Sequence, residues 1–171
     1  VSIGPQRVTS AIKRCIEMGA DQGFHLYYDR MEYVSPSLKS QLIAEFCRNR
    51  KYDLILTGVM SEDTMSAQTG PMIAARLGIP SATSVIKLDV HATGGYIRVE
   101  RELEAGHRCS LDLALPALIA VQSGINRPRY PSFSNVMRAK NTEIKEIRYD
   151  MNVPAGRYET VASIQEAASE R

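Results

Sequence analysis

Short apolar runs alternate with stretches of helical periodicity over the first 88 residues, and this alternation constrains the fold more than any other feature. The run DLILT at 53–57 is bounded by charge and glycine, which is typical of a strand buried on both faces of a sheet. The order β-α-β-α-β predicts an α/β fold with a mostly parallel sheet flanked by helices. Strands are expected at 1–3, 24–28, 53–57 and 82–88, and helices at 4–19, 35–51 and 68–77.

The pattern changes after residue 88. Residues 96–100 and 109–113 alternate between apolar and polar side chains, as half-exposed strands do, and they predict an antiparallel meander attached to the parallel sheet. Residues 116–121 predict one more buried strand. From residue 122 the chain is polar and proline-rich, with helices expected near 135–140 and in the last dozen residues. We therefore divide the chain into an α/β domain at 1–121 and a loop with a C-terminal arm at 122–171.

Charge and hydropathy exclude several classes of protein. The 171 residues carry 21 Lys+Arg against 19 Asp+Glu, a net charge of +2, which does not suggest a nucleic-acid binder. The longest apolar run, 113–121, contains Pro116 and is far shorter than the roughly 20 residues that a membrane-spanning helix needs. The sequence therefore predicts a soluble protein with neither a nucleic-acid partner nor a membrane span.

The cysteines and the first residues indicate the cellular compartment in which the protein is expected. Cys15, Cys47 and Cys109 form no CxxC pair and suit a reducing compartment, so we expect a cytoplasmic protein, or one of the mitochondrial matrix in a eukaryote. Residues 1–5 lack the features of a signal peptide. They resemble the last residues of a strand whose beginning is missing, so we expect a fragment cut near its N-terminus.

A long loop between the third strand and the third helix is the first candidate site. In parallel sheets, ligands bind beyond the carboxyl ends of strands, and free amides at a helix N-terminus favour a phosphate there. Ser66, Thr69 and Gly70 could add hydroxyl and backbone contacts. The loop has no P-loop lysine and no GxGxxG, so a bound nucleotide would be held and not hydrolysed. The alternative is a surface loop closed by a helix cap, with Asp63 or Thr69 as the N-cap.

No acid–base constellation is evident. His25, His91 and His107 are isolated in the sequence, and none accompanies a serine or cysteine nucleophile motif. Packing or solvation is the stronger interpretation for His91 and His107, and Cys109 is expected in the core. We therefore predict no catalytic residue and no metal ligand in this chain.

The segment 125–135 is the second candidate site. Two prolines stiffen it, and it combines Tyr130 and Phe133 with arginines, a composition typical of docking surfaces. The alternative is that both rings fold back into the core.

These segments together resemble the small (beta) subunit of electron transfer flavoproteins over nearly the whole chain. Four pieces in family order carry the resemblance: VSIGP at 1–5 before a helix ending in MGAD at 18–21; DLILTG at 53–58 leading through Asp63 into QTGP at 68–71; VERELE at 99–104; and NRPRY at 126–130 before NVMRAK at 135–140.

The resemblance implies a nucleotide-binding, Rossmann-like fold and a heterodimer with an alpha subunit. Such a heterodimer carries electrons from primary dehydrogenases, for example the acyl-CoA dehydrogenases of fatty acid oxidation, to a quinone oxidoreductase. Its redox FAD lies mostly in alpha, and beta holds an AMP, or a second FAD in electron-bifurcating members. The family's nucleotide contacts fall on Ile3, Gly58, Val59, Met60, Ser61, Glu62, Asp63, Thr64, Met65, Ser66, Ala67, Gln68 and Thr69. Its docking residues fall on Arg129, Tyr130, Phe133 and Asn135.

Three departures from the family pattern qualify this resemblance. The family begins with two further βα units that are absent here. Phe133 stands where many relatives place a leucine, and residues 64–67 replace a more acidic, amide-rich stretch, which leaves AMP and FAD both open. Two alternatives to a simple carrier subunit remain: a bifurcating subunit, and a free-standing ATP-binding stress or signalling domain, which would pack Tyr130 and Phe133 inside.

Overall fold

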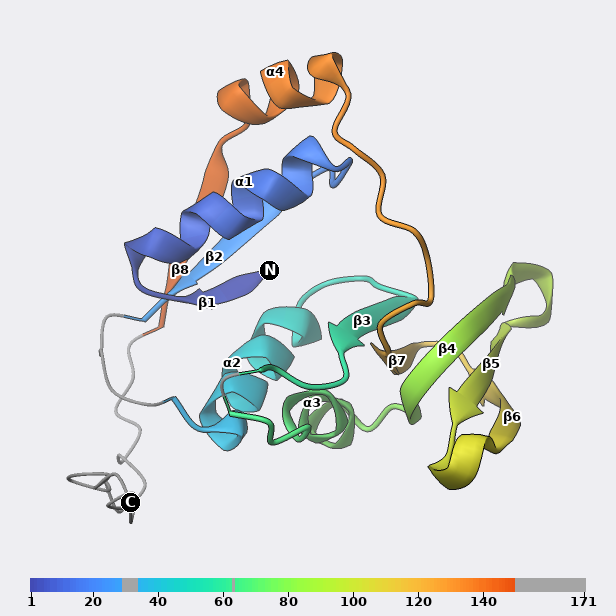
Figure 1. Ribbon diagram of the computed structural model, residues 1–171. Coiled ribbons are helices and arrows are strands. Elements are labelled where there is room, and N and C mark those ends of the chain that lie inside the picture. The colour runs from blue at the N-terminus through green and yellow to red at the C-terminus, as the bar shows by residue number, and fades with distance from the viewer. Residues whose placement is uncertain (29–33, 63, 150–171) are drawn as a thin grey trace, which may run out of the picture.

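The computed structural model describes residues 1–28, 34–62 and 64–149, which form two β-sheets with helices packed on them (Figure 1). The elements in chain order are β1 (Ser2–Gly4), the 3-10 helix η1 (Gln6–Val8), α1 (Thr9–Glu17), β2 (Gly23–Tyr27), α2 (Pro36–Arg48), β3 (Leu54–Gly58), α3 (Thr69–Leu77), β4 (Ser81–His91), η2 (Ala92–Gly94), β5 (Tyr96–Glu102), η3 (Glu104–Gly106), β6 (Arg108–Ala114), β7 (Ala117–Val121), α4 (Phe133–Asn141) and β8 (Ile144–Arg148).

The first sheet has three parallel strands in the order β1-β2-β8. Helix α1 covers it through Ile12 and Ile16, which pack with Ala139 of α4 in a small buried cluster. Figure 1 shows α4 lying next to α1 at the far end of the molecule from the meander. The N-terminal and C-terminal parts of the described chain therefore meet in one sheet.

The second sheet has five strands in the order β3-β7-β4-β5-β6. β3, β7 and β4 are parallel, and β4, β5 and β6 form an antiparallel meander. β7 lies between β3 and β4, and four of its five residues are buried. Both the expected meander and the expected buried strand are thus confirmed.

The single, mostly parallel sheet that the alternation predicted is not what the structure contains. β3 pairs with β7 in the second sheet and has no partner in the first. Burial on both faces is also wrong for β3, since the Leu56 side chain is 56% exposed on this edge strand. Ile3 of β1 and Ile55 of β3 nevertheless pack against the same cluster around Leu42 and Phe46 of α2, so one helix joins the two sheets.

Helix boundaries follow the local signals, apart from the end of α2 at Arg48, short of residue 51, and the start of the first helix. Ser35 caps α2 by accepting a hydrogen bond from the Leu38 amide at 3.2 Å, and Pro36 occupies the first turn. Gly19, expected as the cap of the first helix, directly follows the C-cap residue and has a φ of +118°. At the start of that helix, a 3-10 turn precedes α1.

The C-terminal part contains a strand that the sequence did not suggest. After the irregular stretch 122–132, α4 matches the helix expected near 135–140, and the chain then forms β8 beside β2. The division at residue 121 stays a prediction, although β8 adds the later segment to the sheet of the earlier one. The helix expected in the last dozen residues lies outside the described residues.

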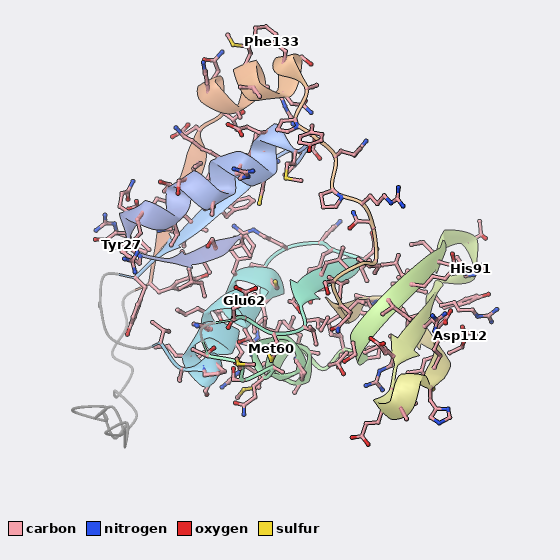
Figure 2. All side chains as sticks on the ribbon, in the orientation of Figure 1. Tyr27, Met60, Glu62, His91, Asp112 and Phe133 are labelled. Atoms are coloured by element: carbon pink, nitrogen blue, oxygen red, sulfur yellow. The ribbon has the colours of Figure 1, made fainter. Side chains whose placement is uncertain are left out.

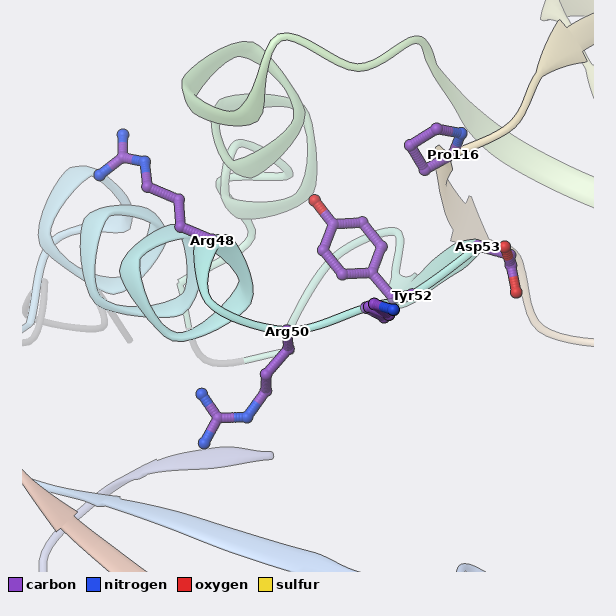
Figure 3. Close-up of a pocket in the computed structure, with 6 residues that line it drawn as sticks. Arg48, Arg50, Tyr52, Asp53 and Pro116 are labelled. Atoms are coloured by element: carbon purple, nitrogen blue, oxygen red, sulfur yellow. The ribbon is translucent and has the colours of Figure 1, made fainter.

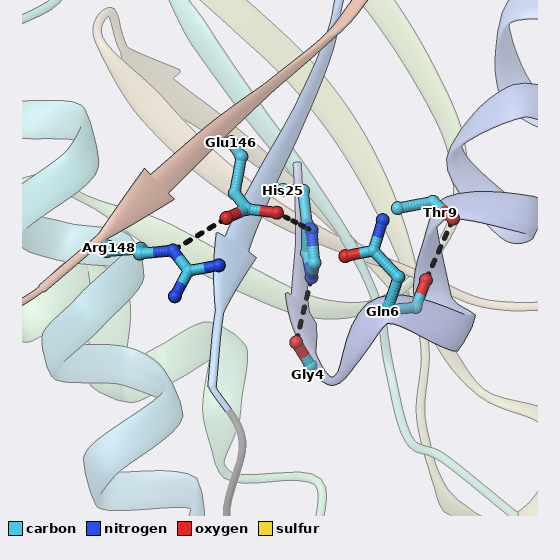
Figure 4. A network of polar contacts seen from close by, with 6 residues as sticks. All are labelled: Gly4, Gln6, Thr9, His25, Glu146 and Arg148. Carbon is cyan, nitrogen blue, oxygen red and sulfur yellow. Dashed lines mark hydrogen bonds and ion pairs between the residues drawn. The ribbon is translucent and has the colours of Figure 1, made fainter.

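A buried histidine links the three strands of the first sheet (Figure 4). The His25 ring is fully buried; its Nε2 is 2.8 Å from the Gly4 carbonyl oxygen and its Nδ1 is 3.7 Å from the Glu146 carboxylate. Arg148 holds the other oxygen of that carboxylate at 2.7 Å. These contacts connect β1, β2 and β8 through side chains as well as through the backbone ladder.

Candidate functional site

The loop between β3 and α3 begins as a continuation of the sheet. The Val59 amide donates to the Val121 carbonyl at 3.0 Å, which prolongs the pairing of β3 with β7. The loop then turns: the Met65 amide donates to the Ser61 carbonyl at 3.0 Å, and the Ser61 and Thr64 hydroxyls are 2.9 Å apart. Ser61, Thr64 and Met65 therefore lie close together.

Two residues of this loop have a left-handed backbone although neither is glycine. Met65 has a φ of 47° and Ala67 a φ of 51°. Each such residue costs about 1–3 kcal/mol, and strain of this kind gathers at binding and switch sites. The surrounding contacts must hold the loop in this shape, which points to a functional loop.

The N-terminus of α3 has no side-chain cap. Gln68 is the N-cap residue and its side chain accepts no backbone hydrogen bond, while Thr69 is the first helical residue and not the cap. The other cap considered, Asp63, lies outside the described residues. The amides of the first turn thus have no side-chain acceptor, and the positive end of the helix dipole is available to an anion.

Gly70 lets this helix end approach the sheet closely. A Cβ at position 70 would lie 2.7 Å from the Thr57 Oγ1 atom and 3.4 Å from a methyl group of Leu118. The Thr57 Oγ1 atom is itself buried and has no hydrogen-bond partner. Glycine at this position is therefore explained by helix–sheet packing, and an unpaired hydroxyl lies under the end of the helix.

The loop residues are accessible. Met60 and Met65 are exposed apolar side chains, and Figure 2 places Met60 and Glu62 together at the lower part of the molecule. The remaining described loop residues range from half-buried to fully exposed: Gly58, Val59, Ser61, Thr64, Ser66, Ala67, Gln68 and Thr69.

Ile3 does not join this loop in one sheet. It lies on β1 of the three-stranded sheet, is half-buried, and packs against the cluster that contains Leu26 and Phe46. The loop follows β3 of the other sheet. Residues 58–62 and 64–69 therefore follow β3 of the five-stranded sheet, while Ile3 lies on an edge strand of the other sheet.

The second candidate site is an exposed segment that ends in α4. The Tyr130 side chain is 96% exposed and that of Phe133 is 82% exposed, so the alternative in which the rings fold into the core is wrong. Arg129 is also exposed, and Asn135 is half-buried. Ser132 caps α4 by accepting a hydrogen bond from the Asn135 amide at 3.2 Å.

The two candidate sites lie far apart. Figure 2 shows Phe133 at the outer end of α4, well separated from Met60 and Glu62. A ligand bound at the loop and a protein bound at the aromatic segment would therefore occupy separate faces.

A shallow pocket between α2 and β3 is a poorer candidate. Its lining includes Arg48, Arg50, Tyr52 and Pro116 (Figure 3). Arg48 pairs with Glu45 at 2.5 Å, and Arg50 donates to the Phe46 carbonyl at 2.7 Å and stacks over the Phe46 ring at 3.7 Å. Both arginines therefore already have partners, which makes the pocket a weaker candidate for an anion.

Potential metal ligands are scattered in residues 1–28, 34–62 and 64–149. This part of the chain contains no group of three or more His, Cys, Asp or Glu that could hold a metal ion. His91 stacks on Tyr96 with ring centroids 4.7 Å apart, which is the packing role expected for it. No helix in the same part is long and apolar enough to cross a membrane.

Sequence reasoning missed two arginines that hold elements together. Arg101 of β5 donates to the Thr83 carbonyl at 2.7 Å and hydroxyl at 2.9 Å. Arg138 of α4 donates to carbonyls at the end of α1. No local pattern could have indicated either contact, because the partners lie 18 and more than 100 residues away.

Comparison with known proteins gives a consistent result. The model of the electron transfer flavoprotein domain matches residues 1–151. The electron transfer flavoprotein beta subunit of Methylophilus methylotrophus is 31% identical over 147 residues, covering 86% of this chain and 56% of the relative. The beta subunit of Sus scrofa is 31% identical over 169 residues, covering 97% of this chain and 65% of the relative.

A third relative, the beta subunit of Bos taurus, is 33% identical over 150 residues, covering 86% of this chain and 58% of the relative. The chain thus spans 56–65% of the length of these curated relatives. A match over most of its residues to the family model, together with relatives above 30% identity, shows that this chain belongs to the electron transfer flavoprotein family.

Proposed function

We propose that this chain acts as the beta subunit of an electron transfer flavoprotein and is not itself an enzyme. In this role it pairs with an alpha subunit that holds most of the redox FAD. The heterodimer moves electrons from a primary dehydrogenase, such as an acyl-CoA dehydrogenase, to a quinone oxidoreductase. Family membership supports this proposal.

The loop 58–69 is the proposed AMP site, and the uncapped N-terminus of α3 is the observation that carries it. Free first-turn amides and a positive helix dipole suit a single phosphate. The buried Thr57 Oγ1 atom beside them lacks a partner, and exposed Met60 and Met65 offer apolar surface to an adenine ring. Lysine and arginine are absent from residues 58–69, so the loop suits a monophosphate better than a triphosphate.

A nucleotide in this loop would have a structural role. AMP supplies no redox chemistry, and it stabilises the native state because it binds that state and not the unfolded chain. The chain's own part is to hold the phosphate at α3 and to keep the strained backbone at Met65 and Ala67 in place.

The segment ending in α4 is the proposed dehydrogenase-docking surface. Arg129, Tyr130, Phe133 and Asn135 lie at this surface, and the high exposure of both rings supports it. The same exposure argues against a free-standing ATP-binding domain, which would have packed both rings inside.

The nucleotide content of the assembled protein tests the cofactor part. The chain is co-expressed with its alpha subunit, the bound nucleotides are released by acid, and they are identified by mass and absorbance. We expect AMP and one FAD per heterodimer. Two FAD without AMP would instead indicate an electron-bifurcating complex with a flavin in the loop 58–69, and no nucleotide beyond the FAD of alpha would refute a nucleotide site here.

Substitution of Phe133 tests the docking part. Phe133→Ala removes the exposed ring and should raise the KM for the donor dehydrogenase, because aromatic anchors carry much of the binding energy at interfaces. Nucleotide content should stay unchanged, since the loop lies on another face. Unchanged donor kinetics in this variant would show that the docking surface lies elsewhere.

A further inference from the structure

Arg138 of α4 connects two helices that are far apart in sequence. Its Nη2 atom donates to the Ile16 carbonyl at 3.2 Å and to the Ala20 carbonyl at 3.1 Å, both at the carboxyl end of α1. Its Nη1 atom lies 3.8 Å from the Asp21 carboxylate. One guanidinium therefore contacts three groups around a single helix end.

The chemistry of a helix end explains why an arginine fits here. The last carbonyls of a helix lack intrahelical donors, and the helix dipole places partial negative charge on them. A guanidinium presents several N–H groups in a planar fork and can bridge two carbonyls, whereas a lysine ammonium acts as a point charge. The Ala20 carbonyl and the Ile16 carbonyl, which also accepts from the Gly19 amide, both lie within reach of this guanidinium.

The packing of α4 buries only one of its side chains fully. The helix has nine residues, and helices of this length are marginal without packing. Ala139 is its one buried residue, and it packs against Ile12 and Ile16 of α1. Beside this apolar packing, the hydrogen bonds of Arg138 fasten α4 to α1.

The opposite end of α4 carries the docking residues. Phe133 is the first residue of the helix, Ser132 caps it, and Tyr130 comes shortly before. A rotation of α4 on α1 would displace the Phe133 ring, because both belong to the same rigid helix. The orientation of this exposed ring therefore depends on the contacts that fasten the helix.

We propose that Arg138 is a positioning residue, which fastens α4 to the carboxyl end of α1 and so holds Tyr130 and Phe133 in the orientation that the partner dehydrogenase recognises. This inference rests on the docking role given under the proposed function. It assigns Arg138 no contact with the partner.

The experiment compares three variants in the assembled heterodimer. Arg138→Met removes every donor while keeping an unbranched side chain, Arg138→Lys keeps the charge, and Lys140→Met is the matched control for loss of one exposed cation on the same helix. Hydrogen exchange of residues 133–141 reports how firmly α4 is held. Steady-state electron transfer from the dehydrogenase gives KM and kcat.

We expect Arg138→Met to raise the KM for the dehydrogenase about tenfold, with kcat and nucleotide content unchanged and with faster exchange in α4. Arg138→Lys should fall between the wild type and Arg138→Met, because it keeps the charge and loses the two-carbonyl bridge. Lys140→Met should leave the KM and the exchange unchanged.

Other outcomes would overturn the inference, and they distinguish a failure of the role of Arg138 from a failure of the proposed docking surface. A KM raised equally by Arg138→Met and Lys140→Met would indicate general electrostatic attraction and not positioning. A KM raised by Phe133→Ala but not by Arg138→Met would remove the role of Arg138 and keep the docking surface. An unchanged KM in Phe133→Ala would refute the docking surface and this inference together, whatever the exchange of α4. If Arg138→Met does not fold, slower or unchanged exchange of α4 in Arg138→Lys would refute the fastening role.

Discussion

The close approach of α3 to the sheet predicts the effect of adding a single methyl group at Gly70. A Cβ there would lie 2.7 Å from the Thr57 Oγ1 atom, 3.4 Å from Leu118 and 3.6 Å from Ala120. The first distance is too short for a real contact, so Gly70→Ala must displace either the Thr57 side chain or α3. Overpacking of this kind costs about 1–3 kcal/mol, and the better helix propensity of alanine returns at most about 1 kcal/mol.

We therefore expect Gly70→Ala to lower the free energy of unfolding by about 1 kcal/mol. Urea denaturation followed by circular dichroism measures this change. Gly58→Ala is the matched control, because a Cβ at position 58 meets nothing within 4 Å and the backbone there has no left-handed φ.

A double-mutant cycle identifies the atom responsible. Thr57→Ala removes the Oγ1 atom, which has no hydrogen-bond partner to lose. In the Thr57→Ala background, Gly70→Ala should cost about 1 kcal/mol less than in the wild type, a coupling within the usual range for residues in contact. If Gly70→Ala leaves stability unchanged or raises it, or if the two substitutions are additive, the steric explanation for this glycine is refuted.

Three further predictions concern charge and reactivity. Gly70→Asp places a carboxylate at the N-terminus of α3, so it should lower the AMP content of the heterodimer as well as its stability; full nucleotide content after acid release would move the phosphate site elsewhere. Burial raises the pKa of the Cys47 thiol while Cys15 is exposed, so maleimide labelling followed by peptide mass analysis should find Cys15 modified first, and equal rates would contradict this burial. The hydrogen bond from Arg98 lowers the pKa of Asp112 in the folded protein. The pair therefore stabilises the fold at pH values above 3.8, the ordinary pKa of this carboxyl group, and the stabilisation is lost as the pH falls through the pKa of Asp112 in the folded protein. Unfolding of wild type and Asp112→Asn across pH should show a stability difference that is constant near neutral pH and shrinks in acid, whereas a difference that persists in strong acid would contradict the pairing.

The periodicity of the sequence was sufficient for most of the local elements, although not for β8. The meander formed by β5 and β6 alternates apolar and polar residues, and β7 is a continuous apolar run, so each was evident from its pattern. The loop 58–69 was evident because small and hydroxylated residues separate β3 from α3. The exposure of Tyr130 and Phe133 was left open, because an aromatic residue in a polar segment can either anchor a partner or fold back.

The contacts between distant elements needed the tertiary structure. Arg138 and His25 looked like ordinary isolated residues in the sequence, yet the structure joins the first to the end of α1 and the second to Gly4 and Glu146. Gly70 looked like a phosphate contact, and the structure gives it a packing role against Thr57. Such roles depend on which elements become neighbours, and that information is not carried by any short segment.

The sequence by itself indicated most of the strands and helices, the antiparallel meander after residue 88 and the buried strand that follows it. It did so because burial and hydrogen bonding within one element repeat with the period of that element. The tertiary structure decided that β3 pairs with β7 and not with β1, and that β8 returns to β2. The exposed edges of different strands offer similar backbone hydrogen bonds. Only the packing of the whole chain therefore makes one strand pairing the most stable.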